Sequence, residues 1–251
     1  MIKHLYGGKY GLVKLRVPLE RGVISRFSPQ TNRDSQVSGE DEILTLKDSQ
    51  GNFIKDVSID EKTTLYHPKI IGNNLYTGLP TFAFELASNI DYTGEGYKKG
   101  WMLNDELVTD YYLINWPTLT VKNQSKEIPS PHFYWWHSDL MNQYGVDIDS
   151  IESVLIAKKA LVKFIVSLLQ NNSEVNSIYD KPQSLQNFLI DKNEKYYIKD
   201  KIRLVYSRNL REKPINIVIP KKYLYKLSQI HTISYRQKRP DIKYKPENIK
   251  Y

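Results

Sequence analysis

The strongest constraint on the fold is a pair of β-forming segments joined by a short turn sequence. Residues 42–46 and 53–59 are rich in β-branched and aromatic side chains, and Asp48-Ser49-Gln50-Gly51 lies between them. This spacing is typical of a β-hairpin. Asp41 directly precedes the first segment and Asp60-Glu61-Lys62 directly follows the second. The hairpin therefore brings these charged residues to one end.

The residues gathered at this end have the composition of a metal site. Side chains two apart on a strand share a face, so we predict that Asp60 and Lys62 point together and that Glu61 points away. Mg²⁺ binds a few carboxylate oxygens together with waters, and an adjacent lysine can stabilise the charge that develops during phosphodiester cleavage. Glu85, on a predicted strand over 81–86, is a third candidate carboxylate.

Each candidate also has a structural interpretation. Asp41 is a residue type that opens turns, and Asp60 and Lys62 could form a surface ion pair of little energetic value. Glu85 lies on a half-buried strand, where a carboxylate needs a partner. For Asp110 we favour a hydrogen bond to the backbone over a role in metal binding.

The rest of the chain predicts an α/β protein. Residues 108–116 form a mostly apolar run that indicates a buried strand, and residues 150–170 carry the apolar stripe of an amphipathic helix. Two more strands and a short helix are predicted at 202–206, 215–219 and 221–229. We expect a mixed central β-sheet flanked by helices over 1–172, and an α+β extension with a basic tail over 173–251.

The charge balance favours a polyanionic partner. The 251 residues carry a net charge of +8, and lysine or arginine bound to phosphates releases counterions from nucleic acid, although a solvated lysine-rich surface gives the same balance. The candidate DNA-binding residues are Lys98 and Lys99 in a predicted loop, and Arg236, Lys238 and Arg239 in the tail. A disordered, solubilising tail is the alternative interpretation.

Two absences in the sequence narrow the class of protein. The chain contains no cysteine, which excludes disulfides and thiolate metal sites. No apolar run has the length that a membrane-spanning helix needs. We therefore expect a soluble, cytoplasmic protein that does not enter a membrane.

Several short motifs follow one another between residues 34 and 116: Gly39-Glu40-Asp41-Glu42-Ile43-Leu44-Thr45-Leu46, Val57-Ser58-Ile59-Asp60-Glu61-Lys62, Phe84-Glu85-Leu86-Ala87-Ser88-Asn89, Gly100-Trp101 and Thr109-Asp110-Tyr111-Tyr112. Their order resembles that of the PD-(D/E)XK, or restriction-endonuclease-like, nuclease superfamily, and in particular its small members from phages and other mobile elements. The resemblance implies a restriction-endonuclease-like core. It also implies Asp41 and Asp60 as metal ligands, Lys62 as the catalytic lysine, and Glu85 as a further acidic residue at the metal.

We therefore expect a Mg²⁺-dependent DNA endonuclease, with Mn²⁺ able to substitute, in which a metal-activated water attacks phosphorus without a covalent intermediate. A homodimer would supply the two sites that double-strand cleavage usually requires. Two alternatives stay open. One is a nucleic-acid-binding or inhibitory protein of a phage or mobile element that keeps the fold without turnover. The other is an interaction protein whose acidic cluster is structural.

Overall fold

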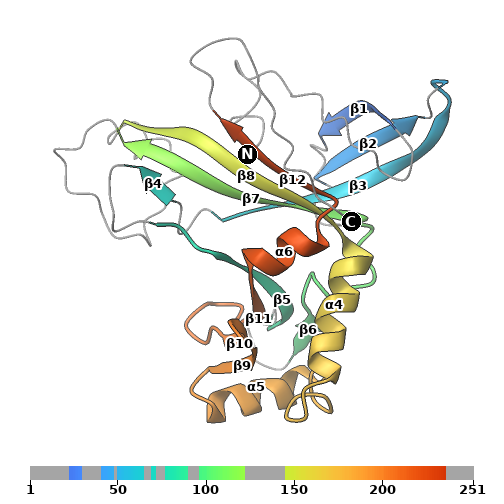
Figure 1. Cartoon of the computed structure of the whole chain (residues 1–251). Coiled ribbons are helices and arrows are strands. Elements are labelled where there is room, and N and C mark those ends of the chain that lie inside the picture. Colours follow the sequence, from blue (N-terminus) through green and yellow to red (C-terminus); the bar gives the residue numbers. More distant parts are fainter. Residues whose placement is uncertain are drawn as a thin grey trace.

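The protein is described by a computed structural model that covers residues 23–29, 41–47, 50–64, 69–71, 77–89, 96–121 and 145–235. Within these ranges the chain forms two β-sheets and three helices. Figure 1 shows the larger sheet above the smaller one, with α4 (Lys158–Gln170) beside the smaller sheet and α5 (Pro182–Asp191) below it. The predicted mixed α/β class is confirmed, with two sheets where a single central sheet was predicted.

The larger sheet contains the predicted hairpin. Its strands follow the order β1 (Val23–Pro29), β2 (Glu42–Lys47), β3 (Phe53–Thr63), β7 (Tyr111–Val121), β8 (Val146–Ala157) and β12 (Ile230–Tyr235), and the short β4 (Lys69–Ile71) also pairs with β7. The β2–β3 pair is antiparallel, which confirms the hairpin, whereas β3 and β4 both run parallel to β7.

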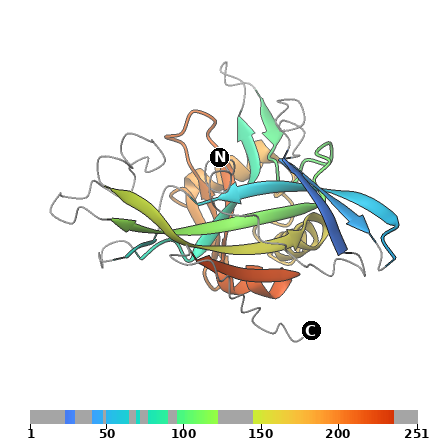
Figure 2. The same cartoon turned by 90° about the horizontal axis from the view of Figure 1, so that it is seen from above.

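The smaller sheet is antiparallel throughout and joins segments from both halves of the chain. Its order is β6 (Tyr97–Lys99), β5 (Thr81–Asn89), β11 (Ile215–Pro220), β10 (Ile202–Tyr206) and β9 (Lys195–Lys199). The strands predicted at 81–86, 202–206 and 215–219 are confirmed, as is the short helix after the last of them, α6 (Lys221–Leu227). Figure 2 shows β5 and β6 projecting beyond one edge of the larger sheet, opposite β12.

The predicted helix over 150–170 is correct only in its second half. Residues up to Ala157 belong to β8, which pairs with both β7 and β12, and the helix begins at Lys158. The interior strand β8 has apolar residues on both faces, and such a run has the same composition as a helix stripe. β7 likewise continues past Pro117, where it was predicted to end. On one side of β7, β3 pairs only as far as Asn115 and β4 begins to pair at Thr118, so no strand on that side needs an N–H from Pro117. The proline therefore sits at a break in that side of the ladder.

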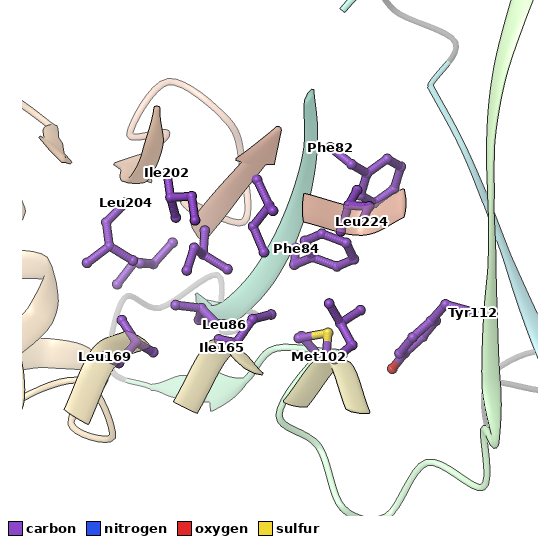
Figure 3. Packing of buried hydrophobic residues seen from close by; sticks show 14 of the residues in the cluster. Phe82, Phe84, Leu86, Met102, Tyr112, Ile165, Leu169, Ile202, Leu204 and Leu224 are labelled. Carbon is purple, nitrogen blue, oxygen red and sulfur yellow. The ribbon is translucent and has the colours of Figure 1, made fainter. Parts of the chain in front are cut away.

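One hydrophobic core fills the space between the sheets and the helices (Figure 3). It includes the fully buried side chains of Phe84 from β5, Ile165 from α4 and Leu204 from β10. Burial of each such side chain contributes roughly 1.5–3 kcal/mol. Since β11 pairs with β5 and β12 pairs with β8, strand pairs cross the boundary predicted at residue 172. That boundary does not separate the two sheets. None of the helices in the described ranges has the length and apolar character to cross a membrane.

Candidate functional site

Asp41 links the start of β2 to the end of β3. Its backbone N–H donates to the carbonyl of Ile59 at 3.0 Å, and its Oδ2 accepts from the backbone N–H of Glu61 at 2.8 Å. The pairing register continues this contact, with Glu42 opposite Ile59. The carboxylate of Asp41 is thereby held beside Asp60, as the hairpin predicted.

Asp60 and Lys62 point to the same side of β3. Lys62 Nζ lies 2.5 Å from Asp60 Oδ1, and the Asp60 side chain is only 4% exposed while that of Lys62 is 29% exposed. The predicted common face is confirmed. The pair is also not the exposed surface contact that the structural interpretation described, because the carboxylate is buried.

The electrostatic balance at Asp60 leaves negative charge only partly compensated. Burial raises the pKa of Asp60 to about 6, the ammonium of Lys62 opposes that shift, and the carboxylate of Asp41 adds to it. A raised carboxyl pKa means that the surroundings disfavour the charged form. An additional cation beside Asp41 and Asp60 would relieve this penalty.

Glu61 lies on the opposite face of β3, as predicted, and belongs to a separate polar cluster. Its Oε1 accepts from Asn115 Nδ2 at 2.6 Å, and Asn115 Oδ1 accepts from Ser153 Oγ at 2.6 Å. Burial raises the pKa of Glu61 to about 7, and the nearby Asp41 carboxylate contributes to the shift. This cluster has no local signal in the sequence, because Asn115 and Ser153 come from strands that are distant along the chain.

Glu85 comes from the smaller sheet and lies within electrostatic range of Lys62. Its Oε1 accepts from Ser88 Oγ at 3.0 Å. Burial raises the pKa of Glu85, the Ser88 hydrogen bond lowers it, Glu212 raises it, and Lys62 lowers it. In the part of the chain that the structure describes, no three Asp, Glu, His or Cys side chains form a group that could hold a metal ion. Asp41 and Asp60 lie close together. Glu85 and Asp60 both interact electrostatically with Lys62.

Trp101 is a site residue whose contacts were not predicted. Its ring centre lies 5.1 Å from Lys62 Nζ, so the ammonium rests over the indole. The ring also packs against Phe84 and Tyr112, at 5.8 Å and 5.2 Å between ring centroids. The backbone carbonyl of Trp101 accepts a hydrogen bond from the Tyr112 hydroxyl at 3.3 Å. These contacts fix the indole, which limits the positions open to the Lys62 amine.

Gly100 allows Trp101 to take this position. Its N–H donates to the Leu86 carbonyl at 2.8 Å, and a Cβ built at this residue would lie 2.4 Å from the Glu85 carbonyl oxygen. Any side chain would therefore collide with the backbone of β5.

Lys158, the first residue of α4, holds the loop that follows Trp101. Its Nζ donates to the carbonyls of Asn104 and Leu107, each at 2.9 Å, and its backbone N–H donates to the Asp110 carbonyl at 2.8 Å. Burial lowers the pKa of Lys158, while neighbouring carboxylates, Asp60 among them, oppose the shift. A second lysine thus lies within electrostatic range of Asp60.

Asp110 has the backbone role that we predicted. Its Oδ2 accepts from the backbone N–H of Ser58 at 3.0 Å, and its own N–H donates to Ser58 Oγ at 3.0 Å. These bonds join the start of β7 to β3 just ahead of Asp60. Asp110 is therefore occupied in holding the parallel strand pair together.

Of the predicted DNA-binding residues, Lys98 and Lys99 are exposed on β6, a strand where a loop was predicted. Lys99 Nζ lies 3.2 Å from Asp105 Oδ2. Arg236, Lys238 and Arg239 lie outside the described residues. Comparison of the chain with protein-family models, with curated proteins and with solved structures gives no match.

Proposed function

We propose that the protein is a divalent-metal-dependent nuclease whose site is formed by Asp41, Asp60 and Lys62. The observation that carries the proposal is the meeting of two carboxylates and an amine at the ends of β2 and β3, with Asp60 buried. Mg²⁺ sites commonly use one or two carboxylates and complete their coordination with waters and substrate phosphates. The two aspartates meet that requirement without Glu85.

Each residue has a defined task in this proposal. Asp41 and Asp60 would hold the ion, which would neutralise the scissile phosphate and lower the pKa of a bound water. Lys62 would leave Asp60 to donate to a phosphate oxygen, where its charge stabilises the transition state. Trp101 would keep the amine close to that oxygen by its contact with the ammonium.

The test is cleavage of labelled single-stranded and duplex DNA in Mg²⁺ or Mn²⁺. We expect Asp60→Asn and Lys62→Met to reduce the rate by about 100-fold or more, as loss of a main electrostatic contributor does. Asp105→Asn is the matched control, because this carboxylate is exposed and forms its ion pair with Lys99. Equal rates for all the proteins would contradict the proposal.

A nucleic-acid-binding protein without turnover is the second candidate. It is favoured by the engagement of Glu85 with Ser88 and by the close contact of Lys62 with Asp60, which occupies both groups within the protein. This candidate predicts salt-dependent DNA binding with no cleavage in any metal. Wild type and Lys62→Met would then be equally inactive while both bind DNA.

A further inference from the structure

One face of the smaller sheet carries polar and basic side chains. Along β10, Leu204 is fully buried while Arg203 and Val205 are partly exposed, and on β11 the fully buried Ile217 lies between Asn216 and Val218. Leu204 and Ile217 belong to the core that buried residues of α4 and α5 also enter, and Figure 3 labels Leu204 within it. Because alternate residues point to opposite faces, the intervening residues form the sheet's other face.

The strand register arranges this other face in two rows. In the first row, Glu85 is opposite Asn216, Asn216 is opposite Val205, and Val205 is opposite Lys195. In the second row the order is Ala83, Val218, Arg203 and Tyr197. Adjacent strands are about 4.8 Å apart, so each row extends about 14 Å from β5 to β9. The first row begins at Glu85, beside the candidate site.

The far end of the face combines an exposed ring with two cations. Tyr197 is 53% exposed, and Lys195 Nζ lies 5.1 Å from its ring centre. A hydrogen bond from Lys195 lowers the pKa of the Tyr197 hydroxyl, and the charges of Lys195 and Arg203 act in the same direction. Glu85 is the only acidic residue in the two rows, and the charge of Lys62 acts on it.

We infer that a single-stranded segment of nucleic acid crosses this face from the candidate site, with Arg203 and Lys195 contacting phosphates and Tyr197 stacking on a base. The inference rests on the proposed nuclease function and specifies its substrate. An exposed ring on an open sheet can stack only on a base that is not paired within a duplex. The short side chains of the exposed Ala83 and the partly exposed Asn216 leave room for the backbone between the two ends, beside the buried Val218.

The experiment measures fluorescence anisotropy of a labelled strand of about 15 nucleotides, and of the same sequence as a blunt duplex, in EDTA. We expect tighter binding of the single strand. Tyr197→Ala should weaken it by about tenfold, and Tyr197→Phe should restore wild-type affinity, because stacking needs only the ring. For the Lys195→Gln/Arg203→Gln protein, the slope of log affinity against log salt concentration should be smaller in magnitude by about 1.4, which corresponds to the loss of two phosphate contacts.

The matched control is Lys222→Gln/Lys226→Gln, which removes the same charge from two exposed positions of α6. It should leave affinity within about twofold, because neither lysine belongs to the two rows and exposed charges that do not contact the ligand are screened. Preference for the duplex, or Tyr197→Ala and Lys195→Gln/Arg203→Gln proteins that bind like this control, would overturn the inference even if cleavage is observed. Weakened single-strand binding without cleavage in any metal would uphold the inference while the nuclease proposal fails.

Discussion

Asp60 and Glu61 are consecutive residues of β3 whose side chains lie on opposite faces of the larger sheet, and burial raises the pKa of both. For Glu61, the described polar contacts are to neutral groups such as Asn115. The folded protein therefore binds a proton at Glu61 more tightly than the unfolded chain does. Its ionisation destabilises the fold as pH rises from 4.5 to about 7 and the penalty stays constant above that range.

Replacing Glu61 by glutamine keeps an oxygen for Asn115 and removes the charge. We expect Glu61→Gln to raise the free energy of unfolding by about 1–3 kcal/mol near pH 8 and to change it little near pH 4. Urea denaturation in EDTA at both pH values checks this. Glu106→Gln, at an exposed position, is the control and should have no comparable pH-dependent effect. A Glu61→Gln effect of the same size at both pH values would show that charge is not the cause.

Gly100 directly follows β6 and approaches the backbone of β5, the neighbouring strand of the smaller sheet, too closely for a side chain. We expect Gly100→Ala to lower the free energy of unfolding by about 1–3 kcal/mol or more, because its Cβ would collide with the backbone of β5. Gly96→Ala is the matched control, since a Cβ there would meet nothing within 4 Å. Thermal denaturation compares the two. Equal melting temperatures would mean that β5 and β6 lie farther apart than described.

At the scale of elements, a single carboxylate on β8 holds both α6 and β12. Glu152 accepts from Lys221 Nζ, from the Tyr225 hydroxyl and from His231 Nε2. Burial alone would raise the pKa of Glu152, but hydrogen bonds from His231, Lys221 and Tyr225 lower it to about 2. Its contribution to stability is thus present above pH 4.5 and is lost as pH falls to about 2.

We expect Glu152→Gln to reduce the free energy of unfolding by about 2–3 kcal/mol near neutral pH, because three donors lose a charged acceptor. The difference from wild type should disappear as the solution approaches pH 2. Denaturant titrations over that range provide the measurement. Glu174→Gln removes an exposed carboxylate paired with Lys192, so little change is expected. A Glu152→Gln protein as stable as this control would refute the anchoring role.

Some elements could be predicted from the sequence because their determinants are local. The β2–β3 hairpin and the proximity of Asp41, Asp60 and Lys62 follow from one turn and a two-residue alternation. The start of α4 could not be predicted, because β8 is covered on both faces and its apolar run lacks the alternation that marks a strand. Burial from distant segments was the missing information.

At the scale of the whole molecule, the assignment of strands to two sheets depends on contacts between distant parts of the sequence. Glu85 is separated from Asp60 by a change of sheet, since β5 pairs with β11 and β3 pairs with β7. The role of Trp101 depends on the same arrangement, because its ring lies between Phe84 of the smaller sheet and Tyr112 of the larger. Neither relation has a local sequence signal.

The shared sheets predict that residues 1–172 do not fold alone. Without β11, β5 loses the strand it pairs with on one side. Phe84 and Leu86 also lose the buried side chains of β10 and β11 that complete their hydrophobic core. We expect a chain ending at residue 172 to show no cooperative thermal transition by circular dichroism, whereas one ending at residue 235 keeps every described strand and melts cooperatively. A cooperative transition in the shorter chain would instead support an independent core.

The most direct test of the central claim is calorimetric titration of the protein with Mn²⁺. If the ends of β2 and β3 form a cation site, wild type binds one ion, and Asp41→Asn and Asp60→Asn each weaken binding by at least about tenfold. Glu85→Gln should bind nearly as wild type does, because Glu85 is bonded to Ser88 rather than to the aspartates. Absence of binding, or binding that neither aspartate variant alters, would contradict the account.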